Sequence, residues 1–504
     1  MARSIQTTKY MPILSKSKYL TGLQCLKSLW VSVHAKERIP ETDESQQHIF
    51  DEGQIIGEYA KKLFPRGIDI PDEDLTKNLK KTKELIQSKP RKILFEAAFS
   101  PEGERVYSRA DILKPVKGNK WDIIEVKSST QVKNVNVSDV AFQKYCYEKA
   151  GLIINKCFIL HINNEYVRKG KINIKKLFVK EDITEKVEEE IQNVQENLKI
   201  MFEVVDSSEP EMKIGSCCNS PYECALKPEC WKSLPEHNVF DLYYGGKKSV
   251  KLLEEGIVSI RDIPEGYELT DKQKIQHYCI KSEEPHVNKG NIKKFIDSLQ
   301  YPLYFLDFET FQTTIPIYNH QSPYQQVPFQ FSLHVIEKKD KEPKHYSFLA
   351  EGSKDPRKEF LKQLKKAIGK KGSIIVYNQC FEQGVLEKLA KVFPKQKETI
   401  AEITDRMVDL LSPFRSFDYY DHKQQGSASI KNVLPALTGK SYEGMDIANG
   451  ANASLQFFYA AHGLNGKKAT DAEIKKIRAD LLKYCHLDTM AMIWILNKLG
   501  EAIK

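Results

Sequence analysis

The segment at residues 303–310, LYFLDFET, constrains the fold more than any other part of this chain. Its apolar and aromatic start predicts a buried strand, on which side chains two positions apart point to the same side. Asp307 and Glu309 therefore share one small volume at the core. Because two like charges at close range are costly without a cation between them, the pair indicates a divalent metal site.

Two later segments extend this pattern. Tyr484 and Asp488 are four residues apart in a segment with helical spacing, which places them on one helix face. Glu382 follows an apolar strand at residues 374–377 that ends in a turn and opens a helix, which adds a fourth carboxylate. Asn378 in that turn has two interpretations: it holds a metal-bound water or a terminal nucleotide, or it caps the helix.

These residues resemble the DEDD exonucleases of the ribonuclease-H-like superfamily, the DnaQ-like 3′-5′ exonucleases, over about residues 299–504. The matched positions are Asp307 and Glu309 in the first motif, Asn378 and Glu382 in the second, and Tyr484 and Asp488 in the third, in its tyrosine variant. The second motif usually carries aspartate where this chain has Glu382, and Asp409 is the alternative ligand. The resemblance implies two Mg²⁺ or Mn²⁺ ions that hold the scissile phosphate, activate a water oriented by Tyr484 and stabilise the leaving oxygen.

The length of 504 residues is too great for one ordinary core and predicts two or three domains. We expect a soluble, cytoplasmic protein, because no apolar run of about 18 residues occurs and the N-terminal segment lacks the apolar core of a secretory signal. A net charge of +9 suits a polyanionic partner and equally a lysine-rich solvated surface. The expected divisions are a nuclease domain at 1–235, a helical connector at 236–298 and an exonuclease domain at 299–504.

The first domain contains a second group of acidic residues. Predicted strands at residues 93–99, 106–113 and 121–127 place Asp111 and Glu125 on adjacent antiparallel strands near the core. Lys127 follows Glu125 by two positions and shares its face. Metal binding accounts for this arrangement. The two carboxylates would bind the metal, and the lysine would stabilise the phosphorane charge or position a water.

The group Asp111, Glu125 and Lys127 resembles the PD-(D/E)xK nucleases. Gln143 and Tyr147 match the Gln-x-x-x-Tyr signature of the RecB-like branch and lie on one helix face by their spacing. The chain departs from that branch at residues 53–57, where a Gly-x-x-x-His motif usually stands and the histidine is missing. The candidates to replace it, to which no role is transferred, are Glu52, Glu58 and Glu96.

Cysteines cluster at the end of this domain. Cys218, Cys224 and Cys230 recur every six residues, and intervening prolines predict a loop and not a regular helix. Together with Cys25, on a helix predicted over residues 21–30, they match the layout of RecB-like nucleases of the AddB and CRISPR-adaptation type, which implies a [4Fe-4S] cluster. Zinc is the alternative, with Cys217 or His237 able to replace one ligand.

The predicted fold class is therefore α/β and multidomain, with a restriction-endonuclease-like PD-(D/E)xK domain and a ribonuclease-H-like mixed-sheet domain. This order resembles a bacterial family that fuses a RecB-like iron-sulfur nuclease to a DnaQ-like exonuclease. The segment at residues 242–257 suggests either a helix-hairpin-helix element or a spacer. The expected function is a metal-dependent DNA exonuclease with two sites. The alternatives are a 3′-5′ exoribonuclease and a non-catalytic iron-sulfur nucleic-acid-binding protein, and the sequence identifies no protein partner.

Overall fold

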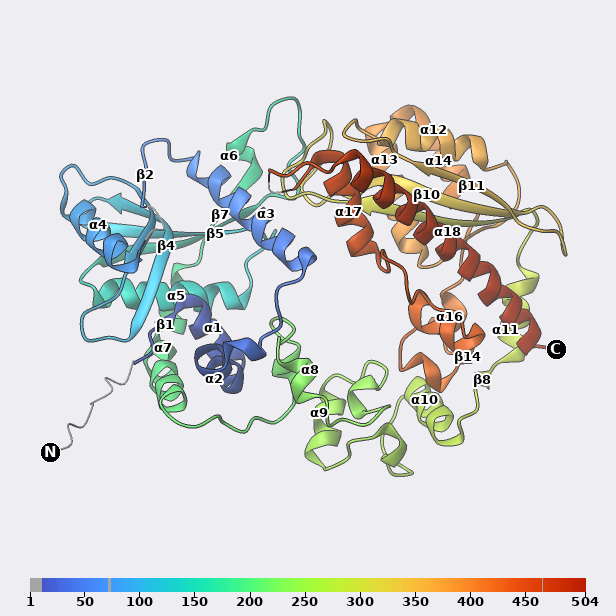
Figure 1. The fold of residues 1–504 in the computed structure, drawn as a ribbon, viewed down its shortest axis with the longest axis horizontal. Helices are drawn as coiled ribbons and strands as arrows, with labels where there is room; N and C mark the ends of the chain where they lie inside the picture. The colour runs from blue at the N-terminus through green and yellow to red at the C-terminus, as the bar shows by residue number, and fades with distance from the viewer. Residues whose placement is uncertain (1–10, 71–73, 465) are drawn as a thin grey trace. The chain divides into compact units, whose positions relative to one another are not determined.

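The computed structural model describes residues 11–70, 74–464 and 466–504 of a mixed α/β protein (Figure 1). It divides into two compact units, which are described separately. The first unit comprises Met1–Ser233 and Thr314–Tyr324, and the second comprises Leu234–Thr313 and Gln325–Lys504. Residues 236–298, which the sequence predicts as a connector, therefore belong to the second unit. No described helix has both the length and the apolarity needed to cross a lipid bilayer.

The first unit is built on a seven-stranded mixed sheet. Its central strands β3, β4 and β5 form an antiparallel meander, while β6 pairs with β5 in parallel. The strand order is β2 (Ile68–Asp69), β3 (Leu94–Phe99), β4 (Val106–Val116), β5 (Lys120–Lys127), β6 (Ile153–Ile162) and β7 (Phe178–Asp182), and β1 (Leu14–Ser15) pairs with β4.

Helices cover both faces of this sheet. The larger core joins one face to α1, α2, α5 and α7, with Tyr19 stacked on Phe142 between two of these helices. A smaller core joins the opposite face to α3. The helices of the unit are α1 (Lys16–Gln24), α2 (Leu26–His34), α3 (Glu44–Lys61), α4 (Leu75–Gln87), α5 (Asn134–Lys149), α6 (Ile174–Leu177), α7 (Thr184–Val205) and α8 (Lys227–Cys230).

The second unit contains a five-stranded mixed sheet in the order β11-β10-β9-β12-β13. The first three strands in sequence pair antiparallel, and β12 and β13 then add in parallel beside β9. The bounds are β9 (Leu303–Phe311), β10 (Val327–Ile336), β11 (Lys344–Leu349), β12 (Ile374–Val376) and β13 (Met407–Asp409). Alternation along β9 sends Leu306 and Phe308 into the core with α12, α13 and α14, and leaves Asp307 and Glu309 on the face covered by α17 and α18.

Six helices pack on this sheet or on the loops beside it: α12 (Arg357–Ala367), α13 (Gln379–Val392), α14 (Lys397–Thr404), α16 (Ile430–Thr438), α17 (Gly450–His462) and α18 (Asp471–Ala502). The remaining helices are α9 (Lys247–Glu254), α10 (Asp271–Ser282), α11 (Lys289–Asp297) and the short α15 (Ser412–Arg415). A two-stranded ribbon of β8 (His286–Val287) and β14 (Tyr419–Tyr420) ties the predicted connector to the rest of the second unit.

Candidate functional site

The second unit gathers its predicted carboxylates below α18. Strand β9 carries Asp307 and Glu309, and α18 carries Tyr484 and Asp488 one helical turn apart. Glu382 comes from the first turn of α13 and is 2% exposed. Each predicted ligand thus lies on a strand or a helix. The carboxyl groups lie close together, because the charge of one raises the pKa of another.

Burial and mutual repulsion dominate the chemistry of this acidic cluster. Burial raises the pKa of Asp307, and the charge of Asp488 raises it further. Glu309 has a raised pKa for the same reasons, with Asp307 and Asp488 both contributing. Burial raises the pKa of Asp488 to about 7, although a hydrogen bond from Tyr442 and the charge of Lys431 oppose the shift. The cluster holds more negative charge than its surroundings compensate.

The donor atoms of this cluster fit a hard divalent cation. Burial and the charge of Asp307 raise the pKa of Glu382, and its buried Oε2 has no hydrogen-bond partner. Cys485 lies beside the carboxylates and donates from Sγ to Asp307 Oδ2 at 3.3 Å. Burial raises the pKa of this thiol and the charge of Asp307 raises it further, so without a bound cation the thiol is protonated. Carboxylate oxygens are the ligands that Mg²⁺ and Mn²⁺ prefer.

Tyr442 is a residue of this site that the sequence did not reveal. Its hydroxyl donates to Asp488 Oδ1 at 2.6 Å across 46 residues of sequence. Its ring centroid lies 6.0 Å from that of Tyr484. Burial raises the pKa of Tyr484, so its phenol stays protonated and available as a donor. Tyr442 precedes α17 and has no periodic relation to α18, so no sequence pattern points to it.

Glu382 and Asp409 differ in their hydrogen bonding, since the buried Oε2 of Glu382 has no hydrogen-bond partner. Asp409 Oδ1 accepts hydrogen bonds from the backbone N–H groups of Asn378 at 2.9 Å and Leu411 at 3.0 Å. Asn378 occupies the N-cap position of α13 in a left-handed conformation, with φ 82°, but its side chain forms no capping hydrogen bond. Its Oδ1 instead accepts from Arg415 at 3.5 Å.

A pocket of about 620 Å³ opens beside the start of α13. Tyr243, Tyr244, Tyr377, Asn378 and Arg415 contribute to its lining. Tyr244 is 87% exposed and meets Tyr243 edge to face, with ring centroids 4.6 Å apart. The pocket therefore offers exposed aromatic rings and a guanidinium group near the element that carries Glu382.

The predicted site of the first unit lies where β4 and β5 separate. Ile112 and Ile124 are the last residues that pair between these two strands. Beyond them, the side chain of Asp111 bridges the strands, since its Oδ2 accepts from the backbone N–H of Val126 at 2.7 Å. Lys127 Nζ donates to Glu125 Oε1 at 2.7 Å. The structure thus brings together the Asp111, Glu125 and Lys127 group that the sequence indicates.

Helix α5, which packs on the sheet, adds Gln143 and Tyr147 to this group. Gln143 Nε2 donates to Glu125 Oε2 at 2.7 Å, and Tyr147 donates its hydroxyl proton to Gln143 Oε1 at 3.1 Å. Both residues hold Glu125 in place and leave little freedom for its carboxylate. Asp139, which the sequence analysis missed, accepts from Lys127 Nζ at 2.6 Å and from Gln143 at 2.9 Å.

Lys16, at the start of α1, is a second missed residue. Its Nζ donates to Glu125 Oε1 at 2.7 Å across 109 residues of sequence. Burial raises the pKa of Glu125, but the charges of Lys127 and Lys16 outweigh it and hold that pKa below its usual range. Burial lowers the pKa of Lys127, but Glu125 and Asp139 outweigh it, so Lys127 is a cation.

Asp111 has a raised pKa, although the charges of Lys16 and Lys127 oppose the shift. Burial and then the charge of Glu125 raise its pKa to about 7. Glu96 adds to this shift from β3, where the pairs Phe95 with Ile112 and Ala97 with Ala110 place it opposite Asp111. Glu96 has φ 58° and forms an ion pair with Arg109 at 3.3 Å. Asp111 and Glu96 together offer oxygen ligands for a divalent cation.

The two other candidates for the missing histidine have different partners. Glu52 accepts from the backbone N–H of Thr314 at 2.8 Å and also from the hydroxyl of that residue. Glu58 forms an ion pair with Lys61 at 2.8 Å on α3. Among the three candidates, Glu96 is therefore the one that lies beside Asp111 and affects its pKa.

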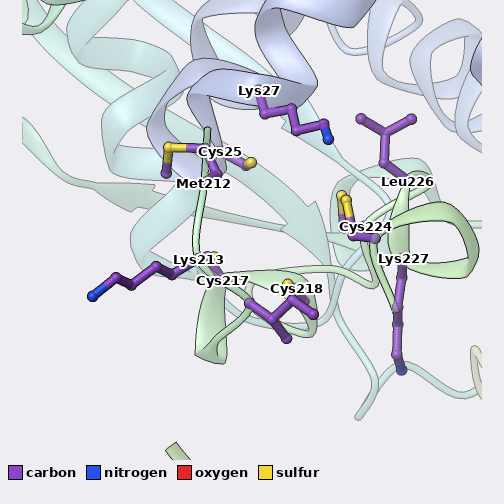
Figure 2. A pocket seen from close by; sticks show the side chains of 11 residues that line it. Cys25, Lys27, Met212, Lys213, Cys217, Cys218, Cys224, Leu226 and Lys227 are labelled. Atoms are coloured by element: carbon purple, nitrogen blue, oxygen red, sulfur yellow. The ribbon is translucent and has the colours of Figure 1, made fainter. Parts of the chain in front are cut away.

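The predicted cysteine ligands line one pocket. The prediction that Cys25 lies on a helix is wrong. Cys25 is an extended residue, with φ −159° and ψ 119°, that separates α1 from α2. Figure 2 shows Cys25 near the α1–α2 junction and Cys217, Cys218 and Cys224 on the later loop. Cys230 completes the lining, while His237 belongs to the second unit. The break at Cys25 lets the backbone leave the helical direction and present the thiol to the pocket.

The thiols of these cysteines are spread around the pocket. No three of these five described sulfur atoms lie within 4.8 Å of one another. Tetrahedral zinc, with Zn–S bonds of about 2.3 Å, would draw its sulfur ligands to within roughly 4 Å. Burial raises the pKa of Cys25 and raises that of Cys217 to about 11, so a positive centre is needed to form the thiolates.

Part of the chain matches a family model, and part is similar to a known protein. A family model described as Domain of unknown function (DUF2779) matches residues 304–429, a segment that includes Asp307, Glu309 and Glu382 but ends before α18. The chain is also similar to Uncharacterized protein MG366 of Mycoplasma genitalium, with 28% identity over 245 residues. That alignment covers 44% of this chain and spans only 36% of the length of the relative. The segment matched by the family model carries three of the four clustered carboxylates, two on β9 and one on α13.

Proposed function

We propose that this protein is a metal-dependent nuclease, a DNA exonuclease with one phosphodiester-cleaving site in each unit. The observation that carries the proposal is the acidic cluster of the second unit, where buried carboxylates raise one another's pKa and Glu382 keeps an unpartnered oxygen. The five-stranded mixed sheet, with three antiparallel strands followed by two parallel ones, supports a ribonuclease-H-like fold for that unit.

In the second unit, Asp307, Glu309, Glu382 and Asp488 would hold two Mg²⁺ or Mn²⁺ ions. The ions would supply a nucleophilic water and neutralise charge on the phosphate. Tyr484, a neutral phenol, would donate a hydrogen bond that orients the water. Tyr442 would fix the Asp488 carboxylate through its 2.6 Å hydrogen bond. The neighbouring pocket, with its exposed tyrosine and Arg415, would receive a base by stacking and a phosphate by charge.

In the first unit, we propose a PD-(D/E)xK nuclease in which Asp111, Glu125 and Glu96 bind a cation. Lys127 would stabilise negative charge on the phosphorane, because its ammonium group is held protonated near the metal. Gln143 and Tyr147 would position Glu125 without touching substrate. A [4Fe-4S] cluster on Cys25, Cys218, Cys224 and Cys230 would join the α1–α2 junction to the end of the unit.

A second candidate function is nucleic-acid binding without cleavage in the first unit. Both oxygens of Glu125 already have partners, since Oε1 accepts from Lys16 and Lys127 and Oε2 accepts from Gln143. A cation would have to displace one of these donors. This favours a weaker site there than in the second unit.

Degradation of 5′- and 3′-labelled single-stranded DNA and RNA with Mg²⁺ or Mn²⁺ tests the proposal. The chains to compare are wild type, Asp307→Ala, Lys127→Ala and the double variant, with Asp297→Asn, an exposed carboxylate of α11, as control. We expect each single change to remove a distinct product ladder, and Asp307→Ala to slow its own ladder by about 10³-fold. Faster loss of RNA than DNA would establish an exoribonuclease, and binding without cleavage by wild type would contradict the enzyme.

A further inference from the structure

Three histidines meet on the second unit's sheet, and the first of them lies two positions along β10 from the residue paired with Asp307. His334 on β10 pairs directly across the strands with His345 on β11, and His486 on α18 lies against both. Their ring centroids are 4.5 to 4.7 Å apart, and one nitrogen of each lies within 4.8 Å of the others. His334 stands opposite Phe305 and not opposite Asp307, so the histidines occupy their own place along β10.

A chain of hydrogen bonds fixes which nitrogen atoms are free. Thr489 Oγ1 contacts the carbonyl oxygen of His486 at 3.1 Å and, because that oxygen only accepts, the hydroxyl must donate there. Thr489 therefore accepts from His334 Nδ1 and from Ser332 Oγ, both at 2.8 Å. Ser332 in turn accepts from His345 Nε2 at 2.9 Å. This assignment satisfies every contact and leaves lone pairs on His334 Nε2 and His345 Nδ1.

This arrangement is the one that metal-binding histidines require. A ligating imidazole usually donates its second N–H to a protein group, which fixes both tautomer and ring orientation. Burial and the neighbouring imidazoles lower the pKa of His334 to about 3 and that of His345 to about 4. An imidazole binds metal in its neutral form, through the nitrogen that carries a lone pair.

We propose that His334, His345 and His486 form a binding site for one zinc ion. Imidazole ligands favour zinc and similar transition metals over Mg²⁺, so the acidic cluster and this site would select different ions. His334 is buried, whereas His345 and His486 are exposed, which leaves a fourth position open to water or another ligand. The ion would tie α18 to β10 and β11, and α18 is the helix that carries Tyr484 and Asp488.

Zinc titration of the full chain tests this proposal without measuring cleavage. The protein is purified without oxygen, passed over a chelating resin and titrated with Zn²⁺ against a colorimetric indicator. The variants are His345→Ala, His486→Ala and their combination, and His286→Ala on β8 is the matched histidine control. We expect wild type and His286→Ala to bind one zinc ion more than the double variant, and each single change to weaken that binding at least about tenfold.

Two further comparisons make the outcome decisive. Zinc should raise the Tm of wild type by about 5 °C at a hundredfold excess over Kd, and should leave the Tm of the double variant unchanged. Cys218→Ser should retain this zinc ion, which separates it from metal held by the cysteines. If the double variant does not fold, His345→Gln on the edge strand replaces it. Equal zinc content in wild type and the histidine variants, or its loss in Cys218→Ser alone, would overturn the proposal.

Discussion

At the scale of single residues, the two candidate active sites differ in how their carboxylates are neutralised. Glu125 in the first unit is surrounded by Lys16, Lys127 and Gln143. The acidic cluster in the second unit has Lys431 as a nearby charge, and the Nζ of that lysine donates to the carbonyl oxygen of Ala448 at 2.6 Å. If both sites bind metal as proposed, we expect the second to depend more strongly on its cation and its activity to respond more to small changes around its ligands.

Tyr442→Phe tests this dependence. The change removes the hydrogen bond to Asp488 Oδ1 but keeps the buried ring, so the fold should persist. We expect cleavage by the second unit to fall about 10- to 100-fold, because a metal ligand loses the group that orients it. Rates are measured in a Lys127→Ala background, where only the second site would act. Tyr459→Phe is the control, since that hydroxyl contacts Glu473 at 3.5 Å outside the site. Equal rates for both variants would exclude a role for Tyr442.

At the scale of helices and strands, the sequence predicts which nearby residues share a face of one element. It does not predict which residues far apart in the sequence contact each other. Asp307 and Glu309 share a face because strands have a period of two, and Gln143 and Tyr147 share one because helices repeat near four. Lys16 reaches Glu125 across 109 residues, a separation that no local period encodes. The mixed α/β class and its two sheets followed from alternating strand and helix patterns, whereas the unit boundaries depend on packing that joins residues 236–298 to β14.

The break between α1 and α2 was also missed, because residues 21–30 are individually compatible with one helix. A local pattern reports helix propensity, which tertiary context can override, and Cys25 is extended between two helices. Substituting the cysteines one at a time therefore tests whether a bound group links the α1–α2 junction to the later loop.

Single cysteine changes should distinguish four ligands from one bystander. We expect protein purified without oxygen to be brown, with broad absorbance near about 400 nm. Cys25→Ser, Cys218→Ser, Cys224→Ser and Cys230→Ser should each reduce this absorbance and lower the Tm of the first unit. Cys217→Ser lines the same pocket and serves as the matched control that keeps the colour. A colourless protein with stoichiometric zinc would refute the iron-sulfur assignment.

At the scale of the whole molecule, each unit buries a carboxyl group that holds its proton more tightly than a carboxyl group in water, although the chain has a net charge of +9. Asp111 and Asp488 both have a pKa raised to about 7. Between pH 4 and 7 the folded chain holds protons on these groups that the unfolded chain has released. The contribution of each carboxyl group to the free energy of unfolding therefore falls as pH rises through this window.

This reasoning predicts the pH dependence of two matched variants. Without metal, Asp488→Asn and Asp111→Asn should each raise Tm relative to wild type, and the gain should grow from pH 4 to pH 8 to a few degrees. Scanning calorimetry across that range measures it, and differences from wild type cancel other titrating groups such as His334. Because the residues lie in different units, the gains should add in the double variant. Mg²⁺ or Mn²⁺ should reverse the order, since the cation stabilises only a chain that keeps its ligands. A gain that is independent of pH, or that survives saturating metal, would show that neither carboxyl group needs a cation.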